Sequence, residues 1–298
     1  MRLWLLLLAL CSCRAIEPAP APAHVKAFWH AIVAANYAPP AGADVQVLAD
    51  ELALTTASTD AELRDELGFE ISARWIRRAG ILEDEYVRDL LRLHLSNQQR
   101  GLGQAESDGV FLRSFSALHL AQIAARDRQH PFLREEERAQ LVQSACRVLR
   151  EERDRRGWVE GKGWAHPIAH NADLLAQLAR GPGLQPDEQR EMLAALDAGL
   201  AGTNAFGENE RLAVVLAQLC ARADFVEPDF ERWLGERAQA ADAVWKTQPF
   251  DVAAFHKSEN TKALLQTVLL GILLDPGASE NEKRIGERIL TTYVSGRG

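Results

Sequence analysis

The sequence predicts an all-α protein, and three observations support this fold class. From His24 onward, apolar residues recur at three- and four-residue spacing, as on the buried face of amphipathic helices. Ala and Leu are abundant while aromatic residues make up only 7%, a composition that favours helices. No segment alternates strictly between apolar and polar residues, as a half-buried strand does. We therefore expect about eleven helices, stacked as antiparallel pairs into an irregular α-solenoid, a superhelix of the HEAT/ARM-like kind.

Length and charge narrow the class of protein further. The chain has 298 residues, of which 47% are hydrophobic and 26% charged, as is typical of a soluble globular protein that forms its core without disulfides or a structural metal. Lys and Arg number 34 against 42 for Asp and Glu, which gives a net charge of −8. A protein that binds the phosphate backbone of a nucleic acid needs a basic surface. We therefore expect no nucleic-acid partner.

Residues 1–12 predict a signal peptide. Arg2 is followed by an apolar run over residues 3–10, which is the order of a positively charged n-region and an h-region. As a helix, this run would rise about 12 Å, too little for the roughly 30 Å hydrocarbon core of a bilayer. The run therefore does not predict a transmembrane anchor.

The residues Leu10-Cys11-Ser12-Cys13 at the end of this run resemble a bacterial lipobox. The resemblance implies cleavage before Cys13, attachment of diacylglycerol to its thiol and a palmitate-bearing lipoprotein. The protein would then lie in the bacterial cell envelope, anchored to the membrane by lipid and facing the periplasm. A plain signal peptide would instead make it a secreted periplasmic protein, and a misassigned start codon would leave it in the cytosol.

Residues 13–23 predict a spacer between the anchor and the folded body. Pro18, Pro20 and Pro22 alternate with other residues, which favours an extended polyproline II segment. Residues 24–298 are expected to form a single all-helical domain. Cys146 and Cys220 each lie in an apolar helical pattern, and we expect buried free thiols there, with a disulfide as the alternative.

Start signals and apolar spacing locate the individual helices. Thr59-Asp60-Ala61-Glu62 is a capping box, and it predicts a helix that continues as far as Trp75. Pro186 and Pro228 lie in the first turn of two further helices, where the missing N–H does no harm. Helices are also expected over residues 110–125, 134–151, 262–274 and 280–294. Because residues 262–274 are nearly all apolar, we expect that helix to be buried.

Chemically active residue types are concentrated in residues 154–175. Residues four apart share a helix face, so His166 and His170 have the spacing of two histidines that bind one metal ion. The cofactor of such a site would be a divalent metal such as zinc. Asp173 lies on the same face but about 10.5 Å along the axis from His166. We therefore expect Asp173 to orient His170 as a hydrogen-bond partner rather than to bind the metal.

The same segment supplies further candidate site residues. Glu160 and Lys162 join His166, His170 and Asp173 as the candidate catalytic residues. The residues expected to bind ligand or complete the site are Trp158, Trp164, Arg113, Glu210 and Arg211. The alternative is purely structural, with glycines that turn the chain, tryptophans that fill the core and histidines that bond to neighbouring helices.

Residues 155–166, with the sequence RRGWVEGKGWAH, resemble the central motif of the bacterial family DUF2785, a domain of unknown function. Residues 113–118 and 208–213 resemble two weaker signatures of this family, and the resemblance covers roughly residues 40–275. It implies an all-helical, repeat-like fold and no established activity. Because members of this family are mostly soluble proteins, the predicted signal peptide and spacer depart from its pattern.

Two classes of function remain open. The architecture favours an envelope-tethered binding or scaffold protein, whose concave face holds a protein, peptide or glycan partner. The dense segment favours a hydrolase in which His166 and His170 act as metal ligands, or as general acid and base, beside Glu160 and Lys162. The sequence has no His-Glu-x-x-His motif, phosphate-binding glycine loop or Gly-x-Ser-x-Gly elbow. It therefore does not specify a reaction.

Overall fold

The structure is a computed structural model that describes residues 22–294, so the predicted signal peptide and Cys13 lie outside the described residues. The chain is 68% helical, which confirms the all-α prediction. Two π-helical segments, η1 (Glu62–Phe69) and η2 (Leu290–Val294), and a hairpin of β1 (Trp158–Val159) and β2 (Gly163–Trp164) accompany the α-helices. The α-helices are α1 (Lys26–Ala34), α2 (Val45–Thr55), α3 (Glu70–Arg77), α4 (Asp84–Gln99), α5 (Gly109–Gln129), α6 (Glu135–Glu151), α7 (Pro167–Ala179), α8 (Pro186–Gly199), α9 (Glu208–Cys220), α10 (Glu227–Val244), α11 (Val252–Leu274) and α12 (Glu280–Ile289).

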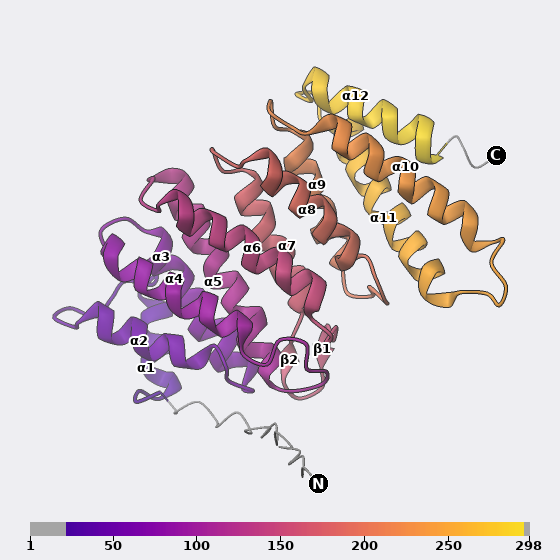
Figure 1. The fold of residues 1–298 in the computed structure, drawn as a ribbon. Helices are drawn as coiled ribbons and strands as arrows, with labels where there is room; N and C mark the ends of the chain where they lie inside the picture. The colour runs from indigo at the N-terminus through magenta and orange to yellow at the C-terminus, as the bar shows by residue number, and fades with distance from the viewer. Residues whose placement is uncertain (1–21, 295–298) are drawn as a thin grey trace, which may run out of the picture.

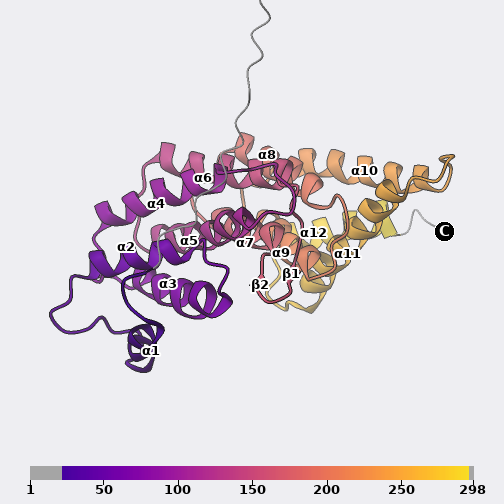
Figure 2. The same ribbon diagram turned by 90° about the horizontal axis from the view of Figure 1, so that it is seen from below.

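The helices stack in two layers along the molecule (Figure 2). Helices α4, α6, α8 and α10 follow one another in the first layer, and α3, α5, α7, α9 and α11 in the second. Each first-layer helix also packs on the next helix in the sequence, which gives the pairs α4–α5, α6–α7, α8–α9 and α10–α11 (Figure 1). Helix α12 packs against α9 and α11 at the C-terminal end. Stacked helix pairs of this kind are the arrangement of an α-solenoid.

A continuous hydrophobic core lies between the two layers. It extends from Trp29 in α1 to Ile289 in α12. Cys146 and Cys220 belong to this core as free, buried thiols, as expected. Burial raises the pKa of both thiols, so neither forms the reactive thiolate at neutral pH.

The predicted helices are present with shifted boundaries. Residues 110–125 lie within α5, and residues 134–151 coincide with α6 to within one residue. In the predicted capping box, the Asp60 carboxylate rather than Thr59 accepts the backbone N–H of Leu63. The residues that follow form π-helix η1, whose Gly68 packs directly on α2. A Cβ atom at Gly68 would lie 2.0 Å from Thr55 Oγ1, so only glycine permits this approach.

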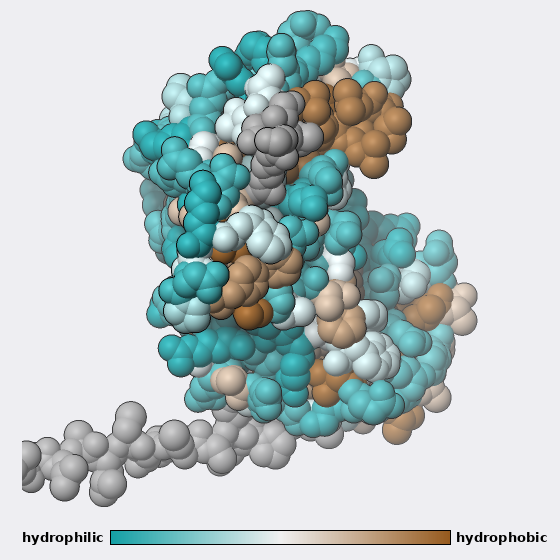
Figure 3. Space-filling model, turned by 90° about the vertical axis from the view of Figure 1, so that its right-hand side faces the viewer, coloured by the Kyte–Doolittle hydropathy of each residue, from teal (hydrophilic) through white to brown (hydrophobic). Residues whose placement is uncertain are grey.

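The prediction of a buried helix over residues 262–274 is wrong at its C-terminal end. Leu270, Leu273 and Leu274 are 57%, 66% and 72% exposed. The physical reason is that this helix lies at the end of the stack, where α12 covers only part of its surface. Seen from the right of Figure 1, the surface is mostly hydrophilic, with separate hydrophobic patches (Figure 3). Within residues 22–294, no helix is both long and apolar enough to cross a membrane.

Candidate functional site

The dense segment forms a short antiparallel hairpin between α6 and α7, where a loop was expected. Trp158 pairs with Trp164 and Val159 with Gly163. The sequence could not reveal these strands, because two residues are too few to display alternation. Backbone bonds at the base of the hairpin, from Ala165 N–H to Gly157 O at 2.8 Å, fix where α7 begins.

The side chain of Arg64 in η1 forms hydrogen bonds with the backbone of the hairpin. This side chain is fully buried and its Nη2 donates to the carbonyl oxygens of Lys162 at 2.8 Å and Trp164 at 3.2 Å. The guanidinium also lies over the rings of Phe111 and Phe115, 4.3 Å and 4.6 Å from their centroids. Burial lowers the pKa of Arg64 to about 10, so the group stays charged at neutral pH. The hairpin is therefore anchored through its backbone, and its side chains remain available.

His166 caps α7 in an unusual backbone conformation. Its φ of 51° lies in the left-handed region, which a non-glycine residue adopts at a cost of about 1–2 kcal/mol. The imidazole stacks on Trp164, with ring centroids 4.9 Å apart. Its Nε2 lies 3.5 Å from Glu208 Oε1, slightly longer than a normal hydrogen bond. The left-handed turn thus directs His166 away from the helix and between the hairpin and α9.

Glu208 at the N-terminus of α9 completes this contact. Its carboxylate is buried and accepts the backbone N–H of Phe206 at 2.8 Å. Burial raises the pKa of Glu208, but its contacts with His166 and with Phe206 N–H outweigh burial, so the net shift is downward. A negative charge at this position is also favoured by the helix dipole. Glu208 is therefore an ionised carboxylate facing an imidazole.

His170 lies one turn further along α7 and is oriented by Ser114 of α5. Its Nδ1 lies 2.7 Å from Ser114 Oγ, and the same hydroxyl donates to the Ala165 carbonyl oxygen. The Ser114 proton is used in that bond, so His170 Nδ1–H is the donor and Nε2 is an acceptor. Burial lowers the pKa of His170 well below its ordinary value, with further lowering from His166 and Arg211. His170 is therefore neutral at pH 7.

The structure corrects two expected partnerships around the histidines. Asp173, expected to orient His170, instead forms a two-oxygen ion pair with Arg211 Nη1 at 2.6 and 2.7 Å. The reason is that α9 packs against α7 and places Arg211 opposite this carboxylate. Burial raises the pKa of Asp173 despite the pair with Arg211. Glu210, expected to complete the site, is exposed, and Glu208 takes that position.

Some of the remaining candidate residues lie on the hairpin, and one stabilises the helices around it. Lys162 pairs with Asp108 at 2.8 Å, and the Trp158 indole N–H lies 3.4 Å from a Glu160 carboxylate oxygen. Arg113, expected to bind ligand or complete the site, instead forms a buried two-bond pair with Glu152 at 2.6 and 3.0 Å. This pair lies inside the stack and supports the start of α5 and the end of α6.

Three aromatic side chains form the exposed part of the site. Trp158, Trp164 and Phe206 are 49%, 38% and 45% exposed. The Trp158 and Trp164 rings are 5.2 Å apart and nearly perpendicular, at 80°. Phe206 lies edge-on to Trp164 at 6.0 Å. Together with His166, these rings form what we call the hairpin surface, defined by Trp158, Trp164, His166 and Phe206.

The donor set does not fit the expected metal site. His166 and His170 have ring centroids 5.6 Å apart, but His166 is the left-handed N-cap of α7 and does not lie on a regular helical face with His170. Within residues 22–294, however, no three His, Cys, Asp or Glu side chains come together in a group that could hold a metal ion. A structural or catalytic zinc site uses three or four protein ligands. We therefore derive no step through a metal.

Sequence reasoning missed the role of Ser114, Glu208, Phe206 and Arg64. These residues come from α5, α9, the loop before α9 and η1, far from the hairpin in the sequence. A signal existed for two of them, since Ser114 and Glu208 lie in the segments 113–118 and 208–213 that resemble the weaker family signatures. Nothing in the local sequence distinguishes Arg64 from a solvent-exposed helical arginine.

Comparison with known proteins agrees with the central motif. The family model described as "Protein of unknown function (DUF2785)" matches residues 99–270, more than half of the chain. The matched segment contains the hairpin and every candidate site residue except Cys13. Searches of curated proteins and of solved structures found no match. The chain therefore belongs to the DUF2785 family.

Proposed function

We propose that this chain is an envelope-tethered binding protein whose hairpin surface binds a glycan. The observation that carries the proposal is the pair of half-exposed tryptophans, Trp158 and Trp164, set at right angles on a hairpin. A pyranose ring presents a face of weakly positive C–H groups, and such a face packs well on the negative face of an aromatic ring. Large exposed aromatic side chains held in place are typical of binding sites rather than of inert surface.

The rigidity of the site supports the same function. Arg64 bonds the hairpin backbone from below, and the stacked ring of His166 supports Trp164 from the side. Ligand binding then loses little conformational entropy, because the aromatic rings are already ordered.

Polar groups around the rings match the hydroxyl and amide groups of a sugar. Glu160 and Lys162 lie on the hairpin turn, and the Asp173–Arg211 pair lies beyond His170. Charged donors and acceptors make the stronger hydrogen bonds. The combination of flat apolar rings and charged groups at their edge suits an amphipathic sugar better than a purely apolar ligand.

The binding test uses the purified full chain and tetra-N-acetylchitotetraose, followed by isothermal titration calorimetry, with a glycan array as a broader screen. Trp164→Ala should weaken binding at least about tenfold, or 1.4 kcal/mol. The matched control is Trp245→Ala, which removes another exposed tryptophan from the end of α10 and should leave affinity unchanged. The proposal fails if no glycan binds, or if both variants lose affinity equally.

The tether is tested separately. If Cys13 carries lipid, Cys13→Ser should move the chain from the membrane fraction to a soluble or uncleaved form. The several acyl chains of a lipoprotein anchor firmly, whereas a single chain binds a membrane only weakly. Unchanged fractionation of the variant would contradict the lipoprotein assignment, without affecting the glycan proposal.

A second function, acid–base hydrolysis of the bound glycan, is favoured by one observation. Burial, His166 and Arg211 keep His170 neutral, and its ring lies 5.6 Å from that of His166, which contacts Glu208. A neutral imidazole has a lone pair that can accept a proton, but a pKa held this low makes it a weak base, so any hydrolysis is expected to be slow. His170→Gln should then abolish release of chitotetraose fragments while glycan affinity persists. Absence of fragment release by the unaltered chain would leave binding as its function.

A further inference from the structure

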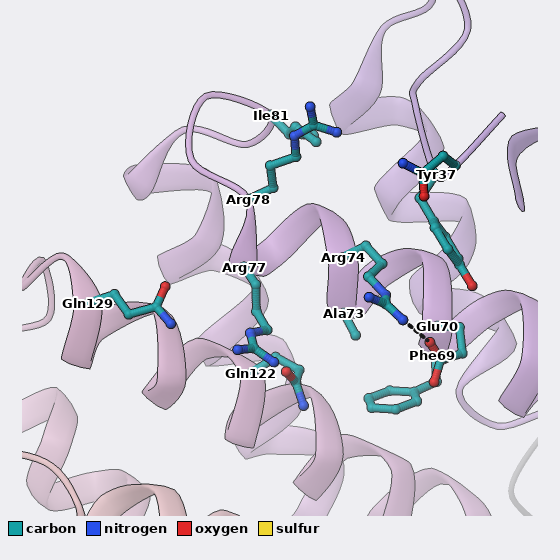
Figure 4. A pocket seen from close by; sticks show the side chains of 11 residues that line it. Tyr37, Phe69, Glu70, Ala73, Arg74, Arg77, Arg78, Ile81, Gln122 and Gln129 are labelled. Carbon is teal, nitrogen blue, oxygen red and sulfur yellow. Dashed lines mark hydrogen bonds and ion pairs between the residues drawn. The ribbon is translucent and has the colours of Figure 1, made fainter.

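A second concave site lies on the other half of α5, away from the hairpin surface (Figure 4). The cavity measures about 590 Å³, within the range of pockets that hold small organic ligands. Three separate segments form it, namely the turn after α1, the end of η1 with helix α3 and the loop that follows, and the C-terminal half of α5. The lining residues are Asn36, Tyr37, Phe69, Glu70, Ala73, Arg74, Arg77, Arg78, Ile81, Gln122 and Gln129.

The lining is strongly basic, although the whole chain carries a net charge of −8. Three arginines, Arg74, Arg77 and Arg78, line the cavity together with a single acidic residue, Glu70 (Figure 4). Arg74 lies 3.5 Å from Glu70 and over the ring of Tyr37. Arg77 and Arg78 form no ion pair with any side chain of residues 22–294. The cavity therefore carries two uncompensated positive charges.

The wall opposite these arginines is held in a fixed shape. Asn36 and Tyr37 have φ values of 55° and 62°, and left-handed backbone at a bulky residue such as Tyr37 persists only where surrounding contacts hold it. Tyr37 N–H donates to Ile32 O at 2.9 Å, and the indole N–H of buried Trp75 donates to Tyr37 O at 2.8 Å. These bonds direct the Tyr37 ring toward Arg74.

Helix electrostatics explain only part of this charge. Arg74 and Arg77 lie in the last turn of α3, where a positive charge stabilises the helix C-terminus. That argument does not extend to Arg78, which lies beyond the helix with an extended backbone. It also does not explain why Gln122 and Gln129 of α5 present amide groups to the same cavity.

We propose that this cavity binds a small organic molecule that carries a phosphate group. Guanidinium groups offer paired N–H donors that match phosphate oxygens in bidentate geometry. Arg77 would bind the phosphate, with Gln122 beside it donating from α5, and Arg78 at the other end of the cavity would add to the positive potential (Figure 4). The Tyr37 and Phe69 rings supply a surface for the organic part. A phosphorylated metabolite and a phospholipid headgroup share this chemistry.

The proposal does not depend on glycan binding. Gln122 lies eight residues beyond Ser114 on α5, roughly 12 Å along the helix axis. Variants at the arginines should therefore leave the hairpin surface intact.

The test compares phenyl phosphate with inorganic phosphate on the full chain, by isothermal titration calorimetry. We expect phenyl phosphate to bind more tightly, and Arg77→Gln/Arg78→Gln to weaken it at least about tenfold. The matched control is Arg153→Gln/Arg180→Gln, which removes the same charge at two exposed arginines outside the cavity. It should retain affinity to within about twofold, because distant surface charges are screened by salt.

A second arm identifies the source of the phosphate. Co-sedimentation with vesicles of phosphatidylcholine and phosphatidic acid, lost in the cavity variant alone, would assign the site to a lipid headgroup. Phenyl phosphate binding without co-sedimentation would assign it to a soluble phosphate ester. The proposal is overturned if neither probe binds, if both double variants lose affinity equally, or if inorganic phosphate binds as tightly as phenyl phosphate.

Discussion

The chain contains two pairs of neighbouring histidines whose surroundings differ in almost every respect. His94 of α4 and His119 of α5 stack face to face, with ring centroids 4.4 Å apart and an angle of 9°. They are 1% and 2% exposed. The ring centroids of His166 and His170 at the start of α7 are 5.6 Å apart, and the ring planes are at 65°. The His166 ring stacks on the exposed ring of Trp164.

Their partners differ as well. Among residues 22–294, the hydrogen-bond partners of the first pair are the hydroxyl of Ser116, at 3.3 Å, and the backbone oxygen of Phe115, at 2.8 Å, and the His119 ring also packs edge-on to Phe69. In the second pair, His166 contacts the ionised Glu208, and His170 contacts Ser114, whose hydroxyl takes part in two hydrogen bonds. The difference shows that a histidine pair is not itself a functional signal. A carboxylate partner and a route to an exposed surface distinguish the pair on α7.

The largest expected effect is on the stability of the first pair. His94→Ala should lower the free energy of unfolding by about 2–4 kcal/mol, because it leaves a cavity in a sealed part of the core. His166→Asn should lower it by less than about 1 kcal/mol, since asparagine tolerates the left-handed conformation. Urea unfolding measures both. Similar losses in the two variants would remove the distinction between the pairs.

Acid should destabilise the protein through the same buried rings. Burial lowers the pKa of His119 to about 4, although its bond to Phe115 raises it, whereas the unfolded value is about 6.5. The unfolded state therefore binds the proton first, so stability is complete above pH 6.5 and falls as the pH drops toward 4. The loss from this group is about 3 kcal/mol at pH 4.

Unfolding curves recorded between pH 7 and 4 test this effect, with His119→Gln as the comparison. The variant is less stable at pH 7 but should show a shallower pH dependence, because one buried titrating group is gone. A slope identical to that of the unaltered chain would contradict a neutral, buried His119.

A smaller effect on stability is expected when the serines that contact the two histidine pairs are replaced. Ser114→Ala should lower the free energy of unfolding by about 1–3 kcal/mol, since it leaves both His170 Nδ1–H and the Ala165 carbonyl without a partner. Ser116→Ala should cost less than about 1 kcal/mol, because its 3.3 Å contact with His94 is long. Thermal unfolding of the two variants side by side measures the difference, and the reverse order would reject the proposed network.

The smallest expected effect on stability is at the hairpin surface. Trp158→Ala should lower the free energy of unfolding by no more than about 1 kcal/mol, because half of the ring is exposed and the rest packs edge-on to Trp164. A loss above about 2 kcal/mol, measured by urea unfolding, would mean that Trp158 is a structural residue rather than a binding residue.

The helical fold could be predicted because its signals are local. The capping residue Asp60 and the helix-opening Pro186 act on neighbouring backbone, and apolar spacing identifies the buried face of each helix. The exposure of Leu274 was not predicted, because burial at the end of the stack depends on whether another helix follows.

Only part of the site could be predicted, because the residues that form it come from segments far apart in the sequence. The i, i+4 spacing placed His166 and His170 together, but their partners Ser114 and Glu208 come from other helices. The left-handed conformation of His166 has no signature in a non-glycine residue. The arginine-lined cavity combines segments near residues 37, 74 and 122, and no sequence motif joins them.

The central claim is that the hairpin surface is the glycan-binding site, and the indole N–H signals of the tryptophans test it most directly. Two-dimensional ¹H–¹⁵N NMR spectra of the full chain should be recorded during titration with tetra-N-acetylchitotetraose. The account predicts shifts of the Trp158 and Trp164 indole signals, while that of the exposed Trp245 stays in place. Saturable shifts confined to Trp245, or none at any tryptophan, would contradict it.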